Sequence, residues 1–238
     1  MNDQGSKSKN ILFLKISGAC SIIQSFLYII AVAALSQTPL LDLLGQSRIQ
    51  GMELFMRSYP ANPWPLMIMC LAFIFMGLLG FIAVAPATEL FLKEQENGWL
   101  TLGKHLGMLC LAVITVYYTW FIVTMPEKAA LYSISDSATK SLIAKIYDPQ
   151  EPSSWISWFM FAGMGLWVAA VGSAAYRNKT LSKGFTLICA VKTGGFWLAH
   201  AGIIFQQAPL AIIGAVAGGL IGGPAYHVWL GIAMRRSQ

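Results

Sequence analysis

Three basic side chains lie inside apolar segments in the last third of the chain. Lys192 has mostly uncharged residues on both sides, and His200 follows eight residues later on nearly the same helical face. His227 lies in the next apolar segment. A charge deep in lipid is costly, so Lys192 must face protein, water or a ligand. These residues are the first candidates for binding or for proton transfer.

The sequence offers Lys192 no carboxylate partner at its own depth. None of the ten acidic residues lies within a predicted membrane span, and the nearest are at one margin, namely Glu89, Glu94 and Glu96. Four states remain open for the lysine. It is a neutral amine, it bonds carbonyls or hydroxyls, it binds an anionic ligand or lipid, or it pairs with a carboxylate of another subunit.

A polar stripe runs along the first apolar segment. Ser21 and Ser25 share one helical face with Ser17 and Tyr28, and Gln24 lies at its margin. Polar side chains in lipid turn toward the bundle interior, where they form hydrogen bonds between helices. We therefore expect Ser21, Gln24 and Ser25 to face the interior and to approach Lys192.

Cofactor and catalytic chemistry have little support in these residues. His105 and His227 are the two histidines that would serve as axial ligands of a b-type haem, but one such pair falls far short of a haem motif. A proton relay through His200, Lys192 and His227 lacks an acid within the membrane. The four cysteines lie in different apolar segments without a CxxC pair, and no hydrolase or nucleotide-binding motif occurs. We predict no metal site, no cofactor and no catalytic residues.

The composition indicates that these residues lie in membrane-spanning segments. The 238-residue chain is 56% hydrophobic, only 11% charged and has a mean hydropathy of +0.62. Soluble domains are about 25% charged. The net charge of +6 comes from residues at the ends of apolar segments rather than from one basic face, which argues against nucleic-acid binding. Residues 1–238 are read as one membrane domain.

Six apolar segments approach the length of about 20 residues that a helix needs to cross a bilayer. The fold prediction is an all-α, six-span membrane bundle, since helices satisfy their own backbone in lipid. The predicted spans are residues 11–35, 64–86, 99–124, 154–176, 182–205 and 208–233.

The basic residues predict that both termini are cytoplasmic. With a cytoplasmic N-terminus, ten Lys and Arg residues lie on that side and five on the other, which agrees with the positive-inside rule. The cytoplasmic set is Lys7, Lys9, Lys15, Lys93, Lys104, Arg177, Lys179, Lys183, Arg235 and Arg236.

Small residues and turn residues predict how the segments connect. Gly214, Gly218 and Gly222 repeat every four residues, a pattern that lets helices approach closely, and Pro224 should kink the sixth span. The outer connection 37–62 has the spacing of a short interfacial helix. The connection 126–151 opens at Pro126 and holds a helix capped by Ser135 or Asp136.

The end of the chain resembles the closing segment of uncharacterised bacterial six-span membrane proteins. In those families a proline and a Trp-Leu-Gly or Trp-Leu-x-x-Gly segment precede terminal arginines after five earlier spans. Residues 224–236 have the similar sequence PAYHVWLGIAMRR. The resemblance implies a bacterial inner-membrane protein of unknown function, and it implies no functional residues.

We therefore expect an integral membrane protein that binds or transports a small anionic or lipid-like molecule. The expected pocket contains Lys192, His200, His227 and the first-span residues Ser21, Gln24 and Ser25. The alternative is a non-catalytic subunit, scaffold or homodimer in which a partner's carboxylate pairs with Lys192. A b-haem redox protein is the third interpretation.

Overall fold

The computed structural model describes residues 3–38, 53–54, 56–92, 98–146 and 155–236. All regular structure in these residues is helical, and six helices are long and apolar enough to cross a membrane. The predicted all-α, six-span class is confirmed. The chain is an integral membrane protein by the length and composition of these helices.

Three of the six spans are single α-helices, and the other three contain a π-helical segment. Span one is α1 (Asp3–Leu35), span three is α5 (Gly98–Ile134) and span five is α9 (Lys183–Ile204). Span two joins α3 (Trp64–Leu79), η2 (Gly80–Val84) and α4 (Ala85–Leu92). Span four joins α7 (Trp155–Ser157), η3 (Trp158–Gly163) and α8 (Met164–Asn178), and span six joins α10 (Ala208–Ala215), η4 (Val216–Ile221) and α11 (Gly222–Arg236).

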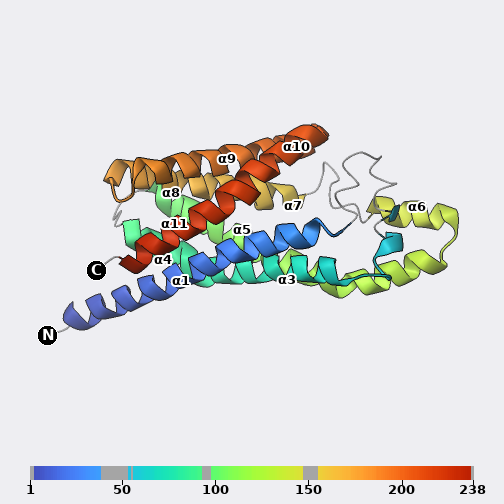
Figure 1. Ribbon diagram of the computed structural model, residues 1–238, viewed down its shortest axis with the longest axis horizontal. Helices are drawn as coiled ribbons and strands as arrows, with labels where there is room; N and C mark the ends of the chain where they lie inside the picture. Colours follow the sequence, from blue (N-terminus) through green and yellow to red (C-terminus); the bar gives the residue numbers. More distant parts are fainter. Residues whose placement is uncertain (1–2, 39–52, 55, 93–97, 147–154, 237–238) are drawn as a thin grey trace.

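The spans follow one another around the bundle. Each packs on its neighbours in the sequence, and span six closes the arrangement by packing on span one through α11 and α1. Both chain ends lie at one end of the elongated bundle, and α6 (Ser137–Ile146) lies at the other (Figure 1). We call the first the terminal end and the second the α6 end.

Span six changes partner along its length. Its first half, α10 and η4, packs mainly on α9, whereas α11 packs mainly on α1 (Figure 1). A Cβ on Gly214 would overlap the backbone nitrogen of Ala199, and one on Gly18 would lie 2.6 Å from the carbonyl oxygen of Gly231. The glycines therefore allow both contacts to be made backbone against backbone.

Prolines explain two of the three π-helical segments. Pro86 and Pro224 each follow one closely, and neither can donate a hydrogen bond to the carbonyl four residues earlier. In both segments the following residue instead donates to a carbonyl five residues back: Ala85 N–H to Gly80 and Gly222 N–H to Ala217. Near Pro224, where the sequence predicted a kink, the helix contains a widened π-helical turn. No proline follows η3, and its cause is not evident.

The structure corrects two predicted span limits. Span three was expected to end before Pro126, but α5 continues through this proline to Ile134. The extra turns bury Met125, Ala129 and Tyr132, so tertiary packing compensates for one missing hydrogen bond. Span two likewise continues to Leu92 and includes Glu89, and Glu127 lies within α5.

The connection at the α6 end agrees in part with the sequence. Asp136 accepts a hydrogen bond of 2.7 Å at Oδ1 from the backbone N–H of Thr139, so it caps α6 as predicted. This hydrogen bond holds the pKa of the Asp136 carboxyl below its usual value. Most of the predicted helix in 37–62 lies outside the described residues.

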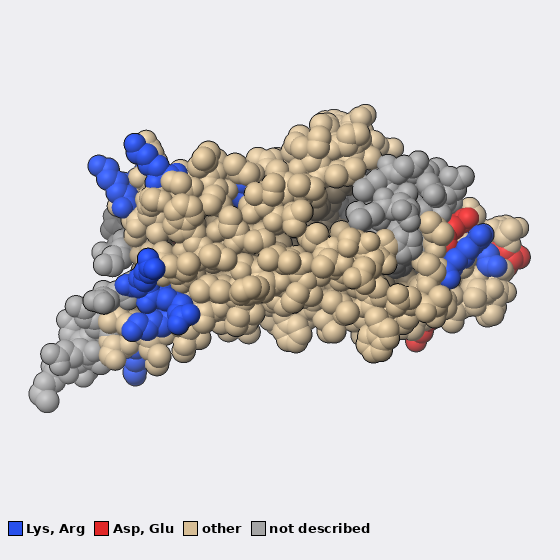
Figure 2. All heavy atoms as spheres, viewed as in Figure 1, with Lys and Arg blue, Asp and Glu red and all other residues tan. Residues whose placement is uncertain are grey.

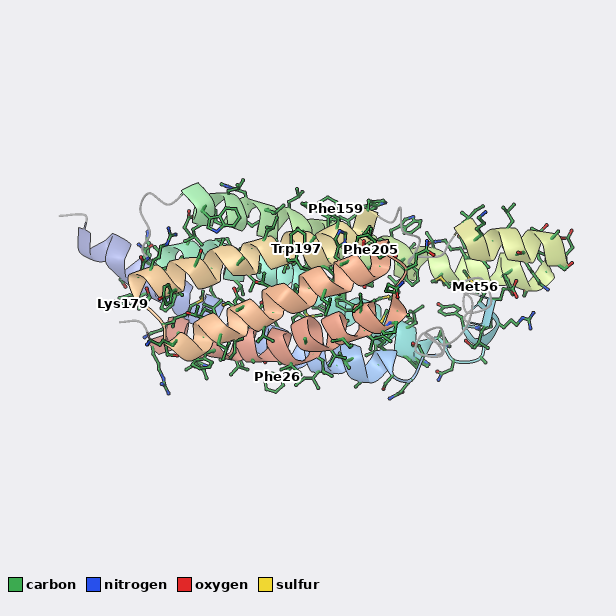
Figure 3. All side chains as sticks on the ribbon, turned by 90° about the horizontal axis from the view of Figure 1, so that it is seen from above. Phe26, Met56, Phe159, Lys179, Trp197 and Phe205 are labelled. Carbon is green, nitrogen blue, oxygen red and sulfur yellow. The ribbon has the colours of Figure 1, made fainter. Side chains whose placement is uncertain are left out.

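The surface has the charge distribution of a membrane protein. Lys and Arg atoms gather at the terminal end, basic and acidic atoms mix at the α6 end, and the face between them is almost uncharged (Figure 2). Phe26 points away from the bundle in Figure 3, and 58% of its surface is exposed. This middle region is the part that lipid covers.

We predict that Gly214→Ala destabilises the bundle strongly and that Gly219→Ala does not. The new methyl group at position 214 meets the α9 backbone, which cannot rotate away, whereas one at position 219 meets no atom within 4 Å. Overpacking typically costs about 1–3 kcal/mol. The unfolding temperature in mild detergent measures both changes. Equal effects of the two variants would contradict the packing assigned to Gly214.

We also predict that both termini face the cytoplasm. In a background without the native cysteines, Ser137→Cys at the α6 end should react with a membrane-impermeant maleimide added to intact cells. Ser182→Cys, between α8 and α9 at the terminal end, should react only after the membrane is opened. The reverse labelling pattern would overturn the charge-based orientation.

Candidate functional site

Lys192 lies inside the bundle with no exposed surface. Its Nζ atom is 3.3 Å from Nε2 of His227 on α11. It also lies 4.3 Å from the ring centroid of Tyr226, 5.3 Å from that of Tyr28 and 5.6 Å from that of Phe196. The amine is therefore held between α9, α11 and α1 by one histidine and three aromatic rings.

Two glycines at the start of α11 make room for this arrangement. A Cβ on Gly222 would lie 2.9 Å from the Cβ of Lys192, and one on Gly223 would lie 3.0 Å from the ring of Tyr28. Both contacts are tighter than ordinary van der Waals distances. Directly after the π-helical segment, α11 therefore packs on Lys192 of α9 through Gly222 and on Tyr28 of α1 through Gly223.

A hydrogen-bonded chain continues from His227 to span one. Its Nδ1 atom lies 3.3 Å from Oγ of Ser21, and the same Oγ donates to the backbone carbonyl of His227 at 2.9 Å. The polar stripe of the first span thus approaches Lys192 through Ser21, with His227 between them.

The direction of this chain follows from counting protons. The Ser21 hydroxyl has one proton, and the shorter contact assigns it to the His227 carbonyl. Nδ1 of His227 must then donate to Ser21, so in the neutral ring Nε2 is the acceptor. With this assignment Lys192 is the donor to His227.

The ring faces suit a positive amine. Their negative quadrupoles attract an ammonium group within about 6 Å of the centroid. No described carboxylate lies within ion-pairing distance of Lys192, whereas Glu89 pairs with Lys104 near the terminal end. The site therefore holds a buried amine in largely uncharged surroundings.

The remaining first-span residues face the interior but bond elsewhere. Gln24 donates from Nε2 to the carbonyl of Met76 on α3 at 2.7 Å, and its Oε1 has no partner among the described residues. Ser25 donates to the carbonyl of Ile22 on its own helix. Ser17 is buried, and its hydroxyl also lacks a described partner.

His200 is not brought together with Lys192. The two residues share α9, but eight residues of helix separate them by about 12 Å along the axis. His200 instead has Nδ1 3.4 Å from Oγ of Ser157 on α7, and its ring meets Trp197 edge to face. The prediction that Lys192 and His200 lie on one face of the helix did not account for the distance between them along the helix axis.

The two haem candidates also lie in different surroundings. His105 is exposed on α5 close to the Glu89–Lys104 ion pair. His227 is buried, and both of its ring nitrogens have partners. An axial bond to His227 would have to replace one of them.

Sequence reasoning missed two of the three aromatic partners of the amine, Tyr226 and Phe196, whereas Tyr28 belongs to the polar stripe of the first span. Tyr226 contacts Lys192 and stacks on Phe185, and its edge meets Trp167 of α8 at 6.1 Å between centroids. The signal available was the position of Tyr226 directly before His227. Phe196, one helical turn after Lys192, was the second signal.

Comparisons of the chain with protein-family models, with characterised proteins and with solved structures found no match.

We predict that Ser21→Ala lowers the stability of the bundle and that Ser25→Ala changes it little. The first substitution leaves the buried Nδ1–H of His227 without an acceptor, which typically costs about 1–3 kcal/mol. The second removes only a bond within α1. Unfolding temperatures in detergent compare the two. A neutral Ser21→Ala variant would contradict the proton assignment in the chain.

Proposed function

We propose that this protein binds a small anion at Lys192 inside the membrane and carries it across. The observation that carries the proposal is a fully buried lysine whose Nζ lies 3.3 Å from Nε2 of His227 and near no described carboxylate. Basic side chains inside membrane spans are rare and commonly belong to substrate or ion paths.

The chemistry of the surroundings favours an anion over a cation or a neutral solute. No described carboxylate lies near the amine, and the three aromatic rings around it exclude water. In such a low-dielectric setting, a negative charge near the ammonium group is bound more strongly than in water. The close packing of the rings favours a small ligand.

The position of the site in span six favours transport. Lys192 and His227 meet where the span leaves α9 and joins α1, next to a π-helical segment and Pro224. Helices that pack on different partners at their two ends can move about such a point. Motion there would separate Lys192 from His227 and expose the site to one side.

The alternative of a non-catalytic subunit, scaffold or homodimer is less well supported. A partner's carboxylate would have to pass between the helices to reach a lysine with no exposed surface. A lipid-like ligand would have to place only its headgroup at this depth. The similarity of the chain end to bacterial six-span proteins supports a location in a bacterial inner membrane.

We expect Lys192→Met to abolish stabilisation by anions. The purified protein is heated in mild detergent with sodium chloride, nitrate, formate or phosphate, and separately with phosphatidylglycerol or phosphatidylcholine. A ligand present at 100 times its Kd stabilises the folded state by about 2.7 kcal/mol. The control is Lys183→Met, which removes an exposed lysine from the same helix.

The outcomes separate the sources of the ligand. A response to soluble anions in the wild type and the control, but not in Lys192→Met, supports the proposal, and liposomes should then take up the same anion. A response to phosphatidylglycerol alone would identify a lipid headgroup and overturn transport of a soluble anion. Unchanged responses in Lys192→Met would show that the lysine is not the binding residue.

A further inference from the structure

Two buried hydrogen-bond donors in the aromatic cluster that includes Tyr226, the ring nearest Lys192, have no partner among the described residues. They are the hydroxyl of Tyr226 and Nε1 of Trp167. Both side chains are almost completely buried, with exposed fractions of 0% and 1%. An unpaired buried donor typically costs about 1–3 kcal/mol, so two of them in one cluster are unusual for a role in packing alone.

The Tyr226 ring links both donors to the lysine. Its centroid is 4.3 Å from Lys192 Nζ and 6.1 Å from the centroid of Trp167. The cluster therefore joins residues of α8, α9 and α11. An indole N–H can only donate a hydrogen bond, and the same is true of an ammonium group. A ligand that satisfies both must be an acceptor.

We infer that Lys192, Tyr226 and Trp167 together form the binding site of a small monovalent anion. This inference rests on the proposed function and names its ligand class and two further binding residues. Tyr226 O–H and Trp167 Nε1–H supply neutral donors, and Lys192 supplies the charge. Lys192 was already expected from the sequence to bind an anionic ligand, whereas Tyr226 and Trp167 were not among the expected binding residues.

Charge balance decides that the anion is monovalent. Lys192 is the only charged side chain described in this cluster, and the other contacts of the Tyr226 ring are with Phe185 and His227. A doubly charged anion would leave one buried negative charge uncompensated, and burial of an unpaired charge is strongly unfavourable. Chloride, nitrate and formate fit this requirement, whereas sulfate does not.

The test variant is Tyr226→Phe, with Tyr132→Phe as its matched control. Each substitution deletes one buried hydroxyl without a described partner, and Tyr132 lies on α5 near the α6 end. Loss of an unpaired hydroxyl should leave the unfolding temperature without ligand unchanged or slightly higher. A purely structural role for Tyr226 therefore predicts two equivalent variants.

We expect Tyr226→Phe to weaken nitrate or formate binding at least about tenfold, a difference of about 1.4 kcal/mol. The measurement is the anion concentration that gives half-maximal stabilisation in detergent. Tyr132→Phe should keep the wild-type value. Trp167→Phe should weaken binding in the same way, and wild-type affinity in this variant would remove Trp167 from the site.

Three results would contradict these proposals, and they differ in which proposal fails. If Lys192→Met loses the response while Tyr226→Phe keeps wild-type affinity, the lysine binds the anion and the extended site is wrong. If sulfate stabilises the wild type as strongly as nitrate at equal ionic strength, the monovalent assignment is wrong. If no anion stabilises the wild type, both proposals fail.

Discussion

The close approach of span six to its two partners is the constraint on which the site depends. Gly214 and Gly218 bring its first half against the α9 backbone, and Gly231 brings its last half against Gly18 of α1. Between these contacts the helix must pass from one partner to the other. The π-helical segment before Pro224 lies at this change of partner, and its widened turn accommodates a carbonyl that the proline cannot pair.

This geometry explains how a lysine can remain buried. Gly222 and Gly223 leave space for Lys192 and Tyr28, and α11 then presents Tyr226 and His227 to the amine. The hydrogen bonds continue to Ser21, so three spans share one polar chain. Hydrophobic contacts alone would not select this arrangement in lipid, where tails are as apolar as the side chains. Packing and polar bonding together select it.

Tyr226 and Trp167 distinguish this site from a lysine that is only tolerated. A structural lysine would have its surroundings satisfied by neighbouring groups, as Lys104 is by Glu89. The hydroxyl of Tyr226, whose ring contacts Lys192, and Nε1 of Trp167 instead have no partner among the described residues. In the site proposed above, such neutral donors would stabilise negative charge without a compensating cation.

Several features could be predicted from the sequence because they follow from local rules. Hydropathy and length predicted six spans, and the glycine spacing in span six predicted a packing face that the structure confirms at Gly214 and Gly218. The burial of Ser21, Gln24 and Ser25 followed from the cost of polar groups in lipid. Helix periodicity also showed which residues share a face, although it does not say what that face meets.

The partners of Lys192 were decided only by the tertiary structure. The sequence placed both His200 and His227 in the expected pocket, but the depth at which α11 crosses α9 brings only His227 to the amine. That depth depends on backbone contacts between residues far apart in the chain, such as Gly222 with Lys192. The course of α5 through Pro126 was likewise set by buried contacts beyond the proline. By itself the sequence determined the class of the fold and the presence of an unpaired charge, since both depend on residue type and local spacing. The surroundings of that charge required the packing of three helices.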